Sequence, residues 1–472
     1  MSTLIRSESP PAAVAALVAR ARAAQAIVDG YDQARVDEVV AAAGWAILEP
    51  GRNRALAELA VRDTGIGDVE DKILKNHRKT LGLLRDLHGK KTVGVISEDK
   101  STGIIEIGRP VGVVCALTPS TNPAATPANK IINSLKARNA VIVAPSPKGA
   151  STCAKLIEFV HAQFDRIGAP RDLVQMLPAP VTKEATAELM RQCDLVVATG
   201  SQANVRAAYA SGTPAFGVGA GNVASIVDET ADVEDAARKI VESKTFDNAT
   251  SCSSENSIVL LEPIAERMLA ALARLGCMRV EGDDRARLEA CMWSEGKLSP
   301  AVIGQSAAAI AQRAGLVDPA ARSARILLVD ESGAGPAHRF SGEKLSPVLT
   351  VYRARDFAES QEIVRRIYGY QGAGHSVSLH SRVEARALEL GLTLPVARVI
   401  LNQVHVVATG GSFSNGLAVS LSMGCGTWGR NSFSDNLNVR HYMNVTRVAL
   451  PIPERVPMVE ELLGPYFVRW GK

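Results

Sequence analysis

The stretch Val111-Gly-Val-Val-Cys-Ala-Leu117 decides the fold class of this chain of 472 residues. It is a short apolar run bounded by turn residues, which is typical of a strand buried on both faces. Strands that alternate with helices predict parallel sheets with crossover helices, so the sequence predicts an α/β protein. Further strands of the same kind are expected at 140–144, 194–199, 257–261, 326–329 and 376–379.

Helical spacing of apolar residues organises the rest of the chain. The first ninety residues are expected to be helical, with helices over 31–48 and 71–87. Later helices are expected to begin at 129 and to cover 151–164. A second α/β half follows from 257 to about 401, and a segment rich in Gly, Ser and Asn over 410–438 is typical of functional loops.

The composition excludes several classes of protein. Lys and Arg number 53 against 49 Asp and Glu, a formal charge of +4, which is weak support for nucleic-acid binding. Hydrophobic residues make up 46% of the chain, which is too many for intrinsic disorder. The seven cysteines never form a CxxC pair, so neither a disulfide framework nor a structural metal site is expected.

The expected location is the cytoplasm, where the thiols stay reduced. No segment of about 20 residues is continuous enough to be expected to span a bilayer. At the N-terminus, Glu8, Pro10, Pro11 and Arg20 interrupt any hydrophobic core of a signal peptide, so no export signal is expected.

Three loops that follow predicted strands are candidates for ligand binding, because ligands of open parallel sheets bind beyond the carboxyl ends of the strands. They cover 118–124, 144–149 and 199–202. No GxGxxG fingerprint is present, and 217–222 matches it only in part. Each loop alone is either a cofactor site or an ordinary turn.

Cys252 stands in the stretch Thr245-Phe-Asp-Asn-Ala-Thr-Ser-Cys-Ser-Ser-Glu-Asn256. Buried structural cysteines prefer aliphatic neighbours, whereas a nucleophilic thiol needs room and hydrogen-bond donors. Small polar neighbours therefore favour a reactive thiol, with an inert loop cysteine as the alternative.

Six motifs, in this order, resemble those of the CoA-acylating branch of the aldehyde dehydrogenase superfamily, over about 53–449. They are Gly65-Ile-Gly-Asp-Val-Glu-Asp-Lys-Ile-Leu-Lys-Asn-His77, Pro110-Val-Gly-Val-Val with Thr121-Asn-Pro123, Thr199-Gly-Ser201, Gly217-Val-Gly-Ala-Gly-Asn222, Lys244-Thr-Phe-Asp-Asn248 before Cys252, and Glu343-Lys-Leu-Ser-Pro347. The resemblance implies two Rossmann-like α/β domains and a small β oligomerisation element.

The resemblance also implies domain boundaries. An NAD(P)-binding domain over 1–228 would include a β-hairpin near 104–114 for oligomerisation. A catalytic domain over 229–430 would carry the nucleophilic cysteine, and 431–472 would form a C-terminal segment and oligomerisation tail. A homo-oligomer, dimer or tetramer, is expected.

The roles of single residues follow from the same resemblance. Cys252 corresponds to the family's nucleophile, and Asn122 to the amide that forms the oxyanion hole with the Cys252 N–H. Glu343 corresponds to the glutamate that binds the nicotinamide ribose. The residues that match the cofactor loops are Thr118, Pro119, Ser146, Gly200 and Ser201. His375 either assists deprotonation of coenzyme A or contacts its phosphates, or is an ordinary loop histidine.

Hydrolytic members of the superfamily carry a glutamate that activates water, in a Glu-Leu-Gly-Gly-Lys context. The matching stretch here, 217–222, has no carboxylate. An acyl-enzyme without a base for water waits for a better nucleophile, which favours transfer to coenzyme A. The alternatives are a hydrolytic aldehyde dehydrogenase, an acyl-phosphate reductase and a non-catalytic nucleotide-binding protein.

The cofactor is expected to be NADP or NAD. NAD-preferring hydrolytic relatives carry a glutamate where this chain has Pro147, and the neighbouring Lys148 would attract a 2′-phosphate.

The substrate is expected to be a small aldehyde. Arg430 in the Gly-rich loop is either an exposed surface charge or a residue whose guanidinium binds an anionic group of the substrate through two hydrogen bonds. Sulfoacetaldehyde is the first candidate, with acetaldehyde and short semialdehydes as alternatives.

Overall fold

Four helices open the part of the chain that the computed structural model describes, residues 10–472. They are α1 (Pro10–Asp29), α2 (Gln33–Leu48), α3 (Pro50–Thr64) and α4 (Val69–Leu87). The side chains of Asp32 and Asp68 cap α2 and α4 by accepting N–H groups of their first turns. The expected helical lead-in is confirmed, and the stretch 1–9 used in the argument about export lies outside the described residues.

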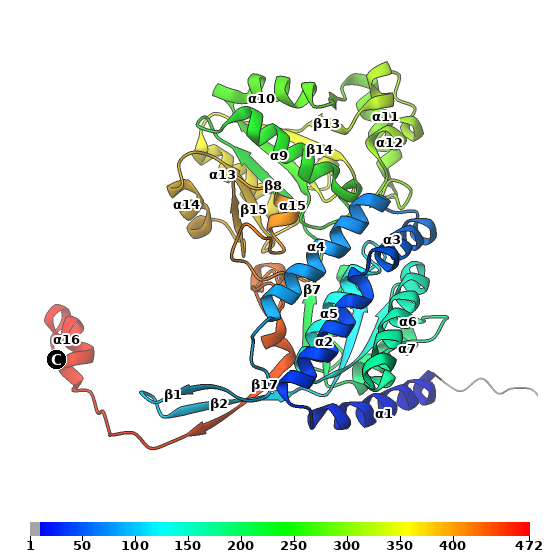
Figure 1. The fold of residues 1–472 in the computed structure, drawn as a ribbon. Helices are drawn as coiled ribbons and strands as arrows, with labels where there is room; N and C mark the ends of the chain where they lie inside the picture. Colours follow the sequence, from blue (N-terminus) through cyan, green and yellow to red (C-terminus); the bar gives the residue numbers. More distant parts are fainter. Residues whose placement is uncertain (1–9) are drawn as a thin grey trace, which may run out of the picture.

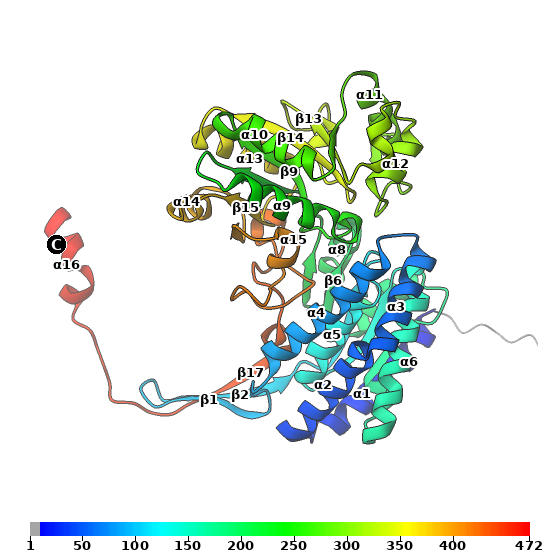
Figure 2. The same ribbon diagram turned by 45° about the horizontal axis from the view of Figure 1, so that its top comes forward.

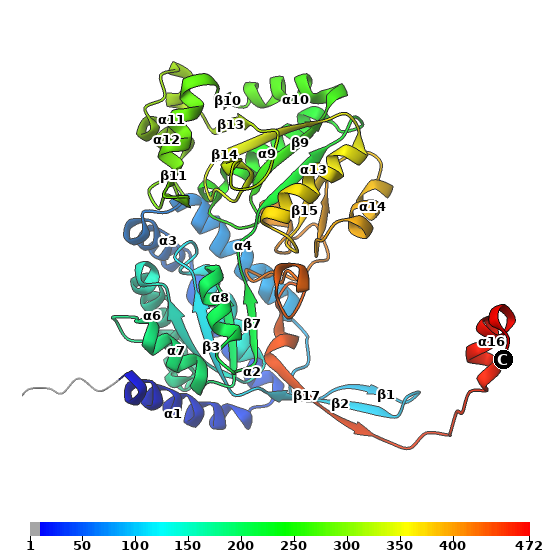
Figure 3. The same ribbon diagram turned by 180° about the vertical axis from the view of Figure 1, so that it is seen from behind.

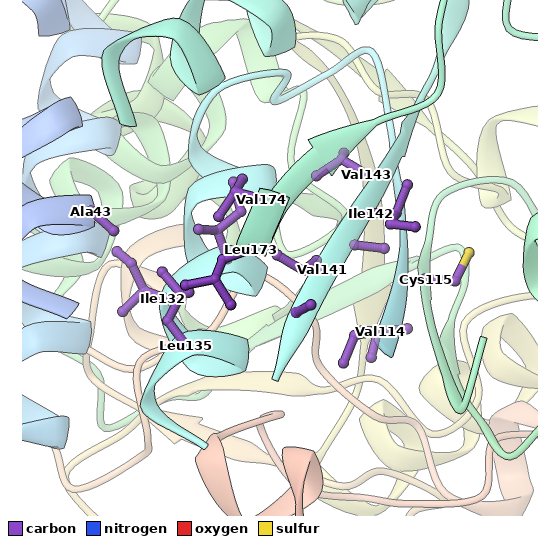
Figure 4. Close-up of a cluster of buried hydrophobic side chains, with 14 of the residues drawn as sticks. Ala43, Val114, Cys115, Ile132, Leu135, Val141, Ile142, Val143, Leu173 and Val174 are labelled. Atoms are coloured by element: carbon purple, nitrogen blue, oxygen red, sulfur yellow. The ribbon is translucent and has the colours of Figure 1, made fainter. Parts of the chain in front are cut away.

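A parallel sheet of five strands forms the first α/β half. Its strands are β3 (Val113–Thr118), β4 (Ala140–Pro145), β5 (Val174–Met176), β6 (Leu195–Thr199) and β7 (Ala215–Val218). The helices between them are α5 (Ala125–Lys136), α6 (Ala150–Ile167), α7 (Lys183–Gln192) and α8 (Gln202–Tyr209). Side chains of α2, α5 and the strands, among them Ala43, Ile132 and Val141, form one buried cluster (Figure 4).

The strand order in this sheet, β5-β4-β3-β6-β7, determines where a ligand can bind. From β3 the chain first builds outward to β4 and β5, and it then returns to add β6 and β7 on the other side. The point where the order reverses lies between β3 and β6, and crevices for ligands open there at the carboxyl ends. The loops after Thr118 and Thr199 therefore border the expected crevice.

The second α/β half is a parallel sheet of seven strands in the order β10-β13-β14-β9-β8-β15-β16. Figure 3 shows this half, with β13, β14 and β9 labelled, above the first half. Its strands are β8 (Val223–Val227), β9 (Glu255–Leu261), β10 (Cys277–Arg279), β13 (Ile326–Asp330), β14 (Val348–Ala354), β15 (Val377–His380) and β16 (Val399–Leu401). Its helices are α9 (Val233–Thr245), α10 (Glu262–Arg274), α11 (Gly282–Met292), α12 (Ala307–Ala314), α13 (Phe357–Tyr370), α14 (Ala385–Thr393) and α15 (His405–Ala408). A two-stranded hairpin, β11 (Trp293–Ser294) and β12 (Lys297–Leu298), is attached to this half.

A third, antiparallel sheet contains the hairpin, which lies earlier in the chain than expected, and the second sheet begins before the expected domain boundary. The third sheet has the order β1-β2-β17, from Gly94–Asp99, Ile104–Pro110 and Met443–Ala449. The hairpin therefore lies at 94–110 rather than near 104–114, because the chain beyond 110 enters the buried strand β3. In addition, β8 pairs with β9 and β15 of the second sheet, so the change of sheet falls between β7 and β8 and not at 228/229.

The C-terminal segment leaves the body of the molecule after β17. It runs past the hairpin and ends in α16 (Val459–Trp470), which stands apart in Figures 1 and 2. None of the residues of α16 is buried, and its large apolar side chains include Leu462, Val468 and Trp470. This arm exposes an apolar surface that no part of residues 10–472 covers.

One helix, α1, is long and apolar enough over Pro11–Asp29 to pass a test for membrane spans, contrary to the sequence-based expectation. Helices from the cores of globular proteins pass the same test. Here Val14, Val18 and Ala21 are buried against the first sheet. Arg22 forms an ion pair with Asp194, with 2.8 Å between Nη1 and Oδ2. These contacts are those of a helix that packs on a globular domain.

Candidate active site

A cavity of about 450 Å³ lies where loops of the second sheet meet the carboxyl ends of β3 and β6. It contains seven of the residues expected from the sequence, which are Cys252, Asn122, Pro119, Lys148, Gly200, Ser201 and Glu343. Strands of the first sheet position the loops of Pro119 and Gly200, whereas Cys252 precedes β9 of the second sheet. The two α/β halves thus contribute different walls of one cavity.

Cys252 lies beside His375, with 3.3 Å between Sγ and Nε2. His375 is buried, and its Nδ1 is 2.8 Å from the hydroxyl of Ser376. Burial, helped by the charge of Arg398, holds the pKa of His375 well below its usual value. The imidazole is therefore neutral, and its Nε2 can accept the proton of the thiol.

The thiol of Cys252 is protonated in this arrangement. Burial raises its pKa to about 12, and Glu343 and Cys425 add to the effect. Nucleophilic attack therefore requires the proton to leave as the sulfur–carbon bond forms, and His375 is the neighbouring group that can take it.

This protonation state predicts how Cys252 responds to alkylation. Because the thiolate is the reactive form, the rate of modification by iodoacetamide should rise about tenfold per pH unit from pH 7 to pH 10, without a plateau. Mass spectrometry of the peptide that contains Cys252 measures the rate, and a Cys252→Ser chain identifies background labelling. A plateau below pH 8 would show a preformed thiolate.

Asn122 is oriented by Lys75 of α4. The ammonium of Lys75 donates to Asn122 Oδ1 at 2.8 Å and also to the carboxylate of Asp247. An ammonium can only donate, so the amide oxygen must face Lys75 and the amide NH₂ must point elsewhere. Asn122 is thus held as a hydrogen-bond donor, which is the role an oxyanion hole requires.

Asp247 ties this arrangement to the loop that carries Cys252. It is fully buried and pairs with both Lys72 and Lys75, which keep its pKa below the usual value despite burial. Asp247, Asn248 and Ala249 have φ of 51°, 51° and 58°, a left-handed run that side chains disfavour. Such strain persists where surrounding contacts hold it, and it is common at functional sites.

Glu343 reaches the cavity from the loop between β13 and β14 of the second sheet. Its Oε1 accepts the N–H of Gly221 at 3.1 Å. Burial raises the pKa of Glu343 to about 8, so its carboxyl group is largely protonated at neutral pH. Among the cavity-lining residues within 10–472 it is the only Asp or Glu.

The groove at the carboxyl ends of β3 and β6 fits a nucleotide. Small residues line it at 199–201 and 219–220, and Ser201 caps the first turn of α8. A Cβ on Gly219 would lie 2.1 Å from the Gln202 amide nitrogen, so the wall tolerates no larger residue there without a shift. The buried hydroxyl of Thr118 has no hydrogen-bond partner within the described residues.

Four expected site residues do not line the cavity. Thr118 and Ser146 lie just beneath its edge, where the Ser146 N–H donates to the Thr118 carbonyl at 2.9 Å. His375 lies behind Cys252. Arg430 is exposed, and it lies outside the wall of the cavity, so the structure does not bring it to Cys252.

Sequence reasoning assigned no role to four further residues of the site. Lys75, Arg78 and Lys79 line the cavity from α4, and their i, i+3, i+4 spacing was the available signal. Arg398 is buried beside His375 and donates to the carbonyls of His375, Gly424 and Ser434, which holds the Gly-rich loop against the site. No pattern in the sequence pointed to it.

Comparisons with known proteins agree with this arrangement. The aldehyde dehydrogenase family profile matches residues 6–286. The chain is 65% identical over 460 residues to a sulfoacetaldehyde dehydrogenase (acylating) of Cupriavidus necator, with 98% of this chain and 93% of that protein covered. It is 42% identical to a protein of the same description from Bilophila wadsworthia, with 96% and 98% covered. The crystal structure of an acetylating aldehyde dehydrogenase from Geobacillus thermoglucosidasius superposes with a TM-score of 0.91 at 34% identity, covering 95% of this chain and 98% of that one.

Proposed function

The chain belongs to the aldehyde dehydrogenase family, and from this membership we propose that it oxidises sulfoacetaldehyde to sulfoacetyl-CoA, with NAD(P)⁺ as the oxidant. It is an oxidoreductase of the CoA-acylating kind, and its fold is that of the acylating aldehyde dehydrogenases. The observation that carries the proposal is the thiol of Cys252, which lines a cavity and is backed by His375. Within the described chain, the only carboxyl group of that cavity is the one of Glu343.

In the first step, Cys252 Sγ attacks the aldehyde carbon while its proton moves to Nε2 of His375. The oxygen of the resulting thiohemiacetal becomes an anion, which the NH₂ group of Asn122 stabilises. One such donor is typically worth about 2.7–4 kcal/mol. Because Lys75 binds the amide oxygen of Asn122, the NH₂ group points away from Lys75. The amide therefore does not have to turn during the reaction.

The residues that would hold NAD(P)⁺ are Pro119, Gly200, Ser201 and Glu343, with Lys148 toward a 2′-phosphate. When bound, the cofactor accepts a hydride from the thiohemiacetal carbon, which leaves a thioester on Cys252. The attraction between Lys148 and a 2′-phosphate favours NADP over NAD as the cofactor.

Coenzyme A is the second substrate. His375 first releases to solvent the proton it took from Cys252. The thiol of coenzyme A then attacks the thioester carbon and passes its proton to His375, and Cys252 leaves as the thiolate and takes that proton back from His375. Water competes poorly, because Glu343 is largely protonated near neutral pH and already binds the Gly221 N–H. Acyl transfer to a thiol is therefore favoured over hydrolysis.

A panel of aldehydes tests the proposal. Sulfoacetaldehyde should give sustained NAD(P)H formation with coenzyme A, with a kcat/KM at least about tenfold above those of acetaldehyde and succinate semialdehyde. Absorbance at the nicotinamide band follows the reaction, and mass spectrometry identifies the thioester. A higher kcat/KM for acetaldehyde would show that sulfoacetaldehyde is not the substrate. Steady turnover without coenzyme A would show that coenzyme A is not the acyl acceptor.

We further propose that the chain forms a dimer or tetramer and works in the cytoplasm. The β1-β2-β17 sheet and the arm that ends in α16 are the surfaces that suit assembly, since the arm exposes apolar side chains such as Leu462 and Trp470. All seven cysteines are free, which suits a reducing compartment.

A further inference from the structure

One face of α4 brings positive charge into the substrate cavity. Lys75, Arg78 and Lys79 all line it. The charge of Lys75 is balanced by Asp247. No acidic side chain within residues 10–472 forms an ion pair with Arg78 or Lys79. Arg78 and Lys79 therefore bring positive charge to the cavity without a direct acidic partner within residues 10–472, although Asp86 lies close enough to favour the charged form of Lys79.

Lys79 is fixed by the backbone of the second α/β half. Its ammonium donates to the carbonyls of Val407, Gly410 and Gly411 at 3.2, 2.9 and 2.9 Å. Burial and the nearby charges of Lys75 and Arg78 lower the pKa of Lys79 to about 7. An anion placed beside it would relieve this repulsion.

Arg78 has its hydrogen-bonding capacity free. Its guanidinium stacks on the ring of Phe413 at 5.2 Å and forms no hydrogen bond within the described chain. A guanidinium presents two parallel N–H groups to a tetrahedral oxyanion, and stacking on a ring leaves these edges open.

The loop that binds Lys79 also connects it to Cys252. The carbonyl of Val406 accepts from the hydroxyl of Ser253, the residue after Cys252, at 3.3 Å. Val407, the next residue, binds Lys79. On the helix, Lys75 and Lys79 are four residues apart, about 6 Å along the axis. Lys75, which contacts Asn122, and the cations Arg78 and Lys79 thus lie on one face of α4 and line the same cavity.

We propose that Arg78 and Lys79 form the subsite for the anionic group of the aldehyde, a sulfonate in the reaction proposed above, on which this inference rests. Arg78 provides the direct hydrogen bonds. Lys79, whose three protons are used by carbonyls, provides charge and holds the 407–411 loop in place. Arg430, expected from the sequence to bind the anion, has no part in this subsite because it lies outside the cavity wall.

The test compares two aldehydes of the same length, sulfoacetaldehyde and propionaldehyde, at saturating coenzyme A and NAD(P)⁺. Arg78→Met should lower the ratio of their kcat/KM values at least tenfold, mainly through KM for sulfoacetaldehyde, and Arg78→Lys should lower it less. Lys79→Met should lower the same ratio. Arg430→Met, which removes an exposed arginine of the Gly-rich loop, is the matched control and should leave the ratio unchanged.

Binding is measured separately with ethanesulfonate as an inhibitor. It should compete with sulfoacetaldehyde in the unchanged enzyme and in Arg430→Met, and about tenfold more weakly in Arg78→Met. The proposed subsite would be wrong if Arg78→Met and Lys79→Met both left the ratio of the two kcat/KM values unchanged, or if Arg430→Met lowered that ratio equally. Neither result would affect the proposed reaction. An unchanged enzyme that fails to oxidise sulfoacetaldehyde would overturn the proposed reaction itself.

Discussion

A chain with alanine in place of Cys252 is expected to form NAD(P)H at least about 10⁴-fold more slowly than the unchanged enzyme. The change removes the atom that bonds to the substrate, and no other thiol can replace it. Cys425, the other cysteine near the site, is buried and does not line the cavity. Absorbance of the reduced nicotinamide measures the loss.

The unchanged enzyme provides the complementary result. Without coenzyme A it should form at most one NAD(P)H per subunit and then stop, because the thioester on Cys252 has no acceptor. A mass increase on the peptide that contains Cys252 would show that thioester. Cys291→Ala, a change of the same type in α11 and outside the cavity, is the control and should retain turnover. Activity that survives in Cys252→Ala would disprove the assignment of the nucleophile.

The second large effect is expected at Lys75. Lys75→Met should lower kcat by about 10²–10³, because Asn122 loses the contact that turns its NH₂ group toward the substrate oxygen. Asn122→Ala should have an effect of similar size. If Lys75 acts through Asn122, the double variant should be no slower than Asn122→Ala alone, which is the non-additivity expected of two residues that act as a unit.

Lys72→Met is the matched control for this experiment. Lys72 lies on the same helix and shares the partner Asp247, but does not contact Asn122. Removing either lysine should destabilise the fold by about 3–5 kcal/mol, since a buried carboxylate loses one partner. Thermal unfolding measures that loss. Additive effects of Lys75→Met and Asn122→Ala on kcat would reduce Lys75 to a structural role.

The fold was predictable where burial alone determines the sequence. Strands such as β3 and β4 are buried along their whole length, so continuous apolar runs mark them. In contrast, five of the six residues of β1 are exposed, and Gly94-Val-Ile-Ser-Glu-Asp99 shows no apolar pattern. The hairpin was therefore placed too late in the chain. Its pairing with β17, more than 300 residues away, leaves no local signal either.

The site was predictable where chemistry is concentrated in one short motif. The small polar residues around Cys252 pointed to a nucleophile, which the cavity and His375 support. The cation for the substrate was assigned to Arg430 because its loop looked functional. Arg78 and Arg430 are both exposed arginines, and the sequence cannot distinguish them. The structure distinguishes them, because α4 runs along the cavity and places Arg78 in its lining, whereas Arg430 is not part of that lining.

The close contact of the 217–222 loop with its neighbours constrains how this enzyme can evolve. A side chain on Gly221 would begin 2.0 Å from the carbonyl oxygen of Cys252, and one on Gly217 would begin 2.7 Å from Val205. A carboxylate that activates water therefore cannot be acquired at these positions by one substitution, because the backbone around the nucleophile or the helix α8 would have to move with it. At these two positions, the preference for a thioester product is therefore a property of the backbone packing around the nucleophile as well as of the missing carboxylate.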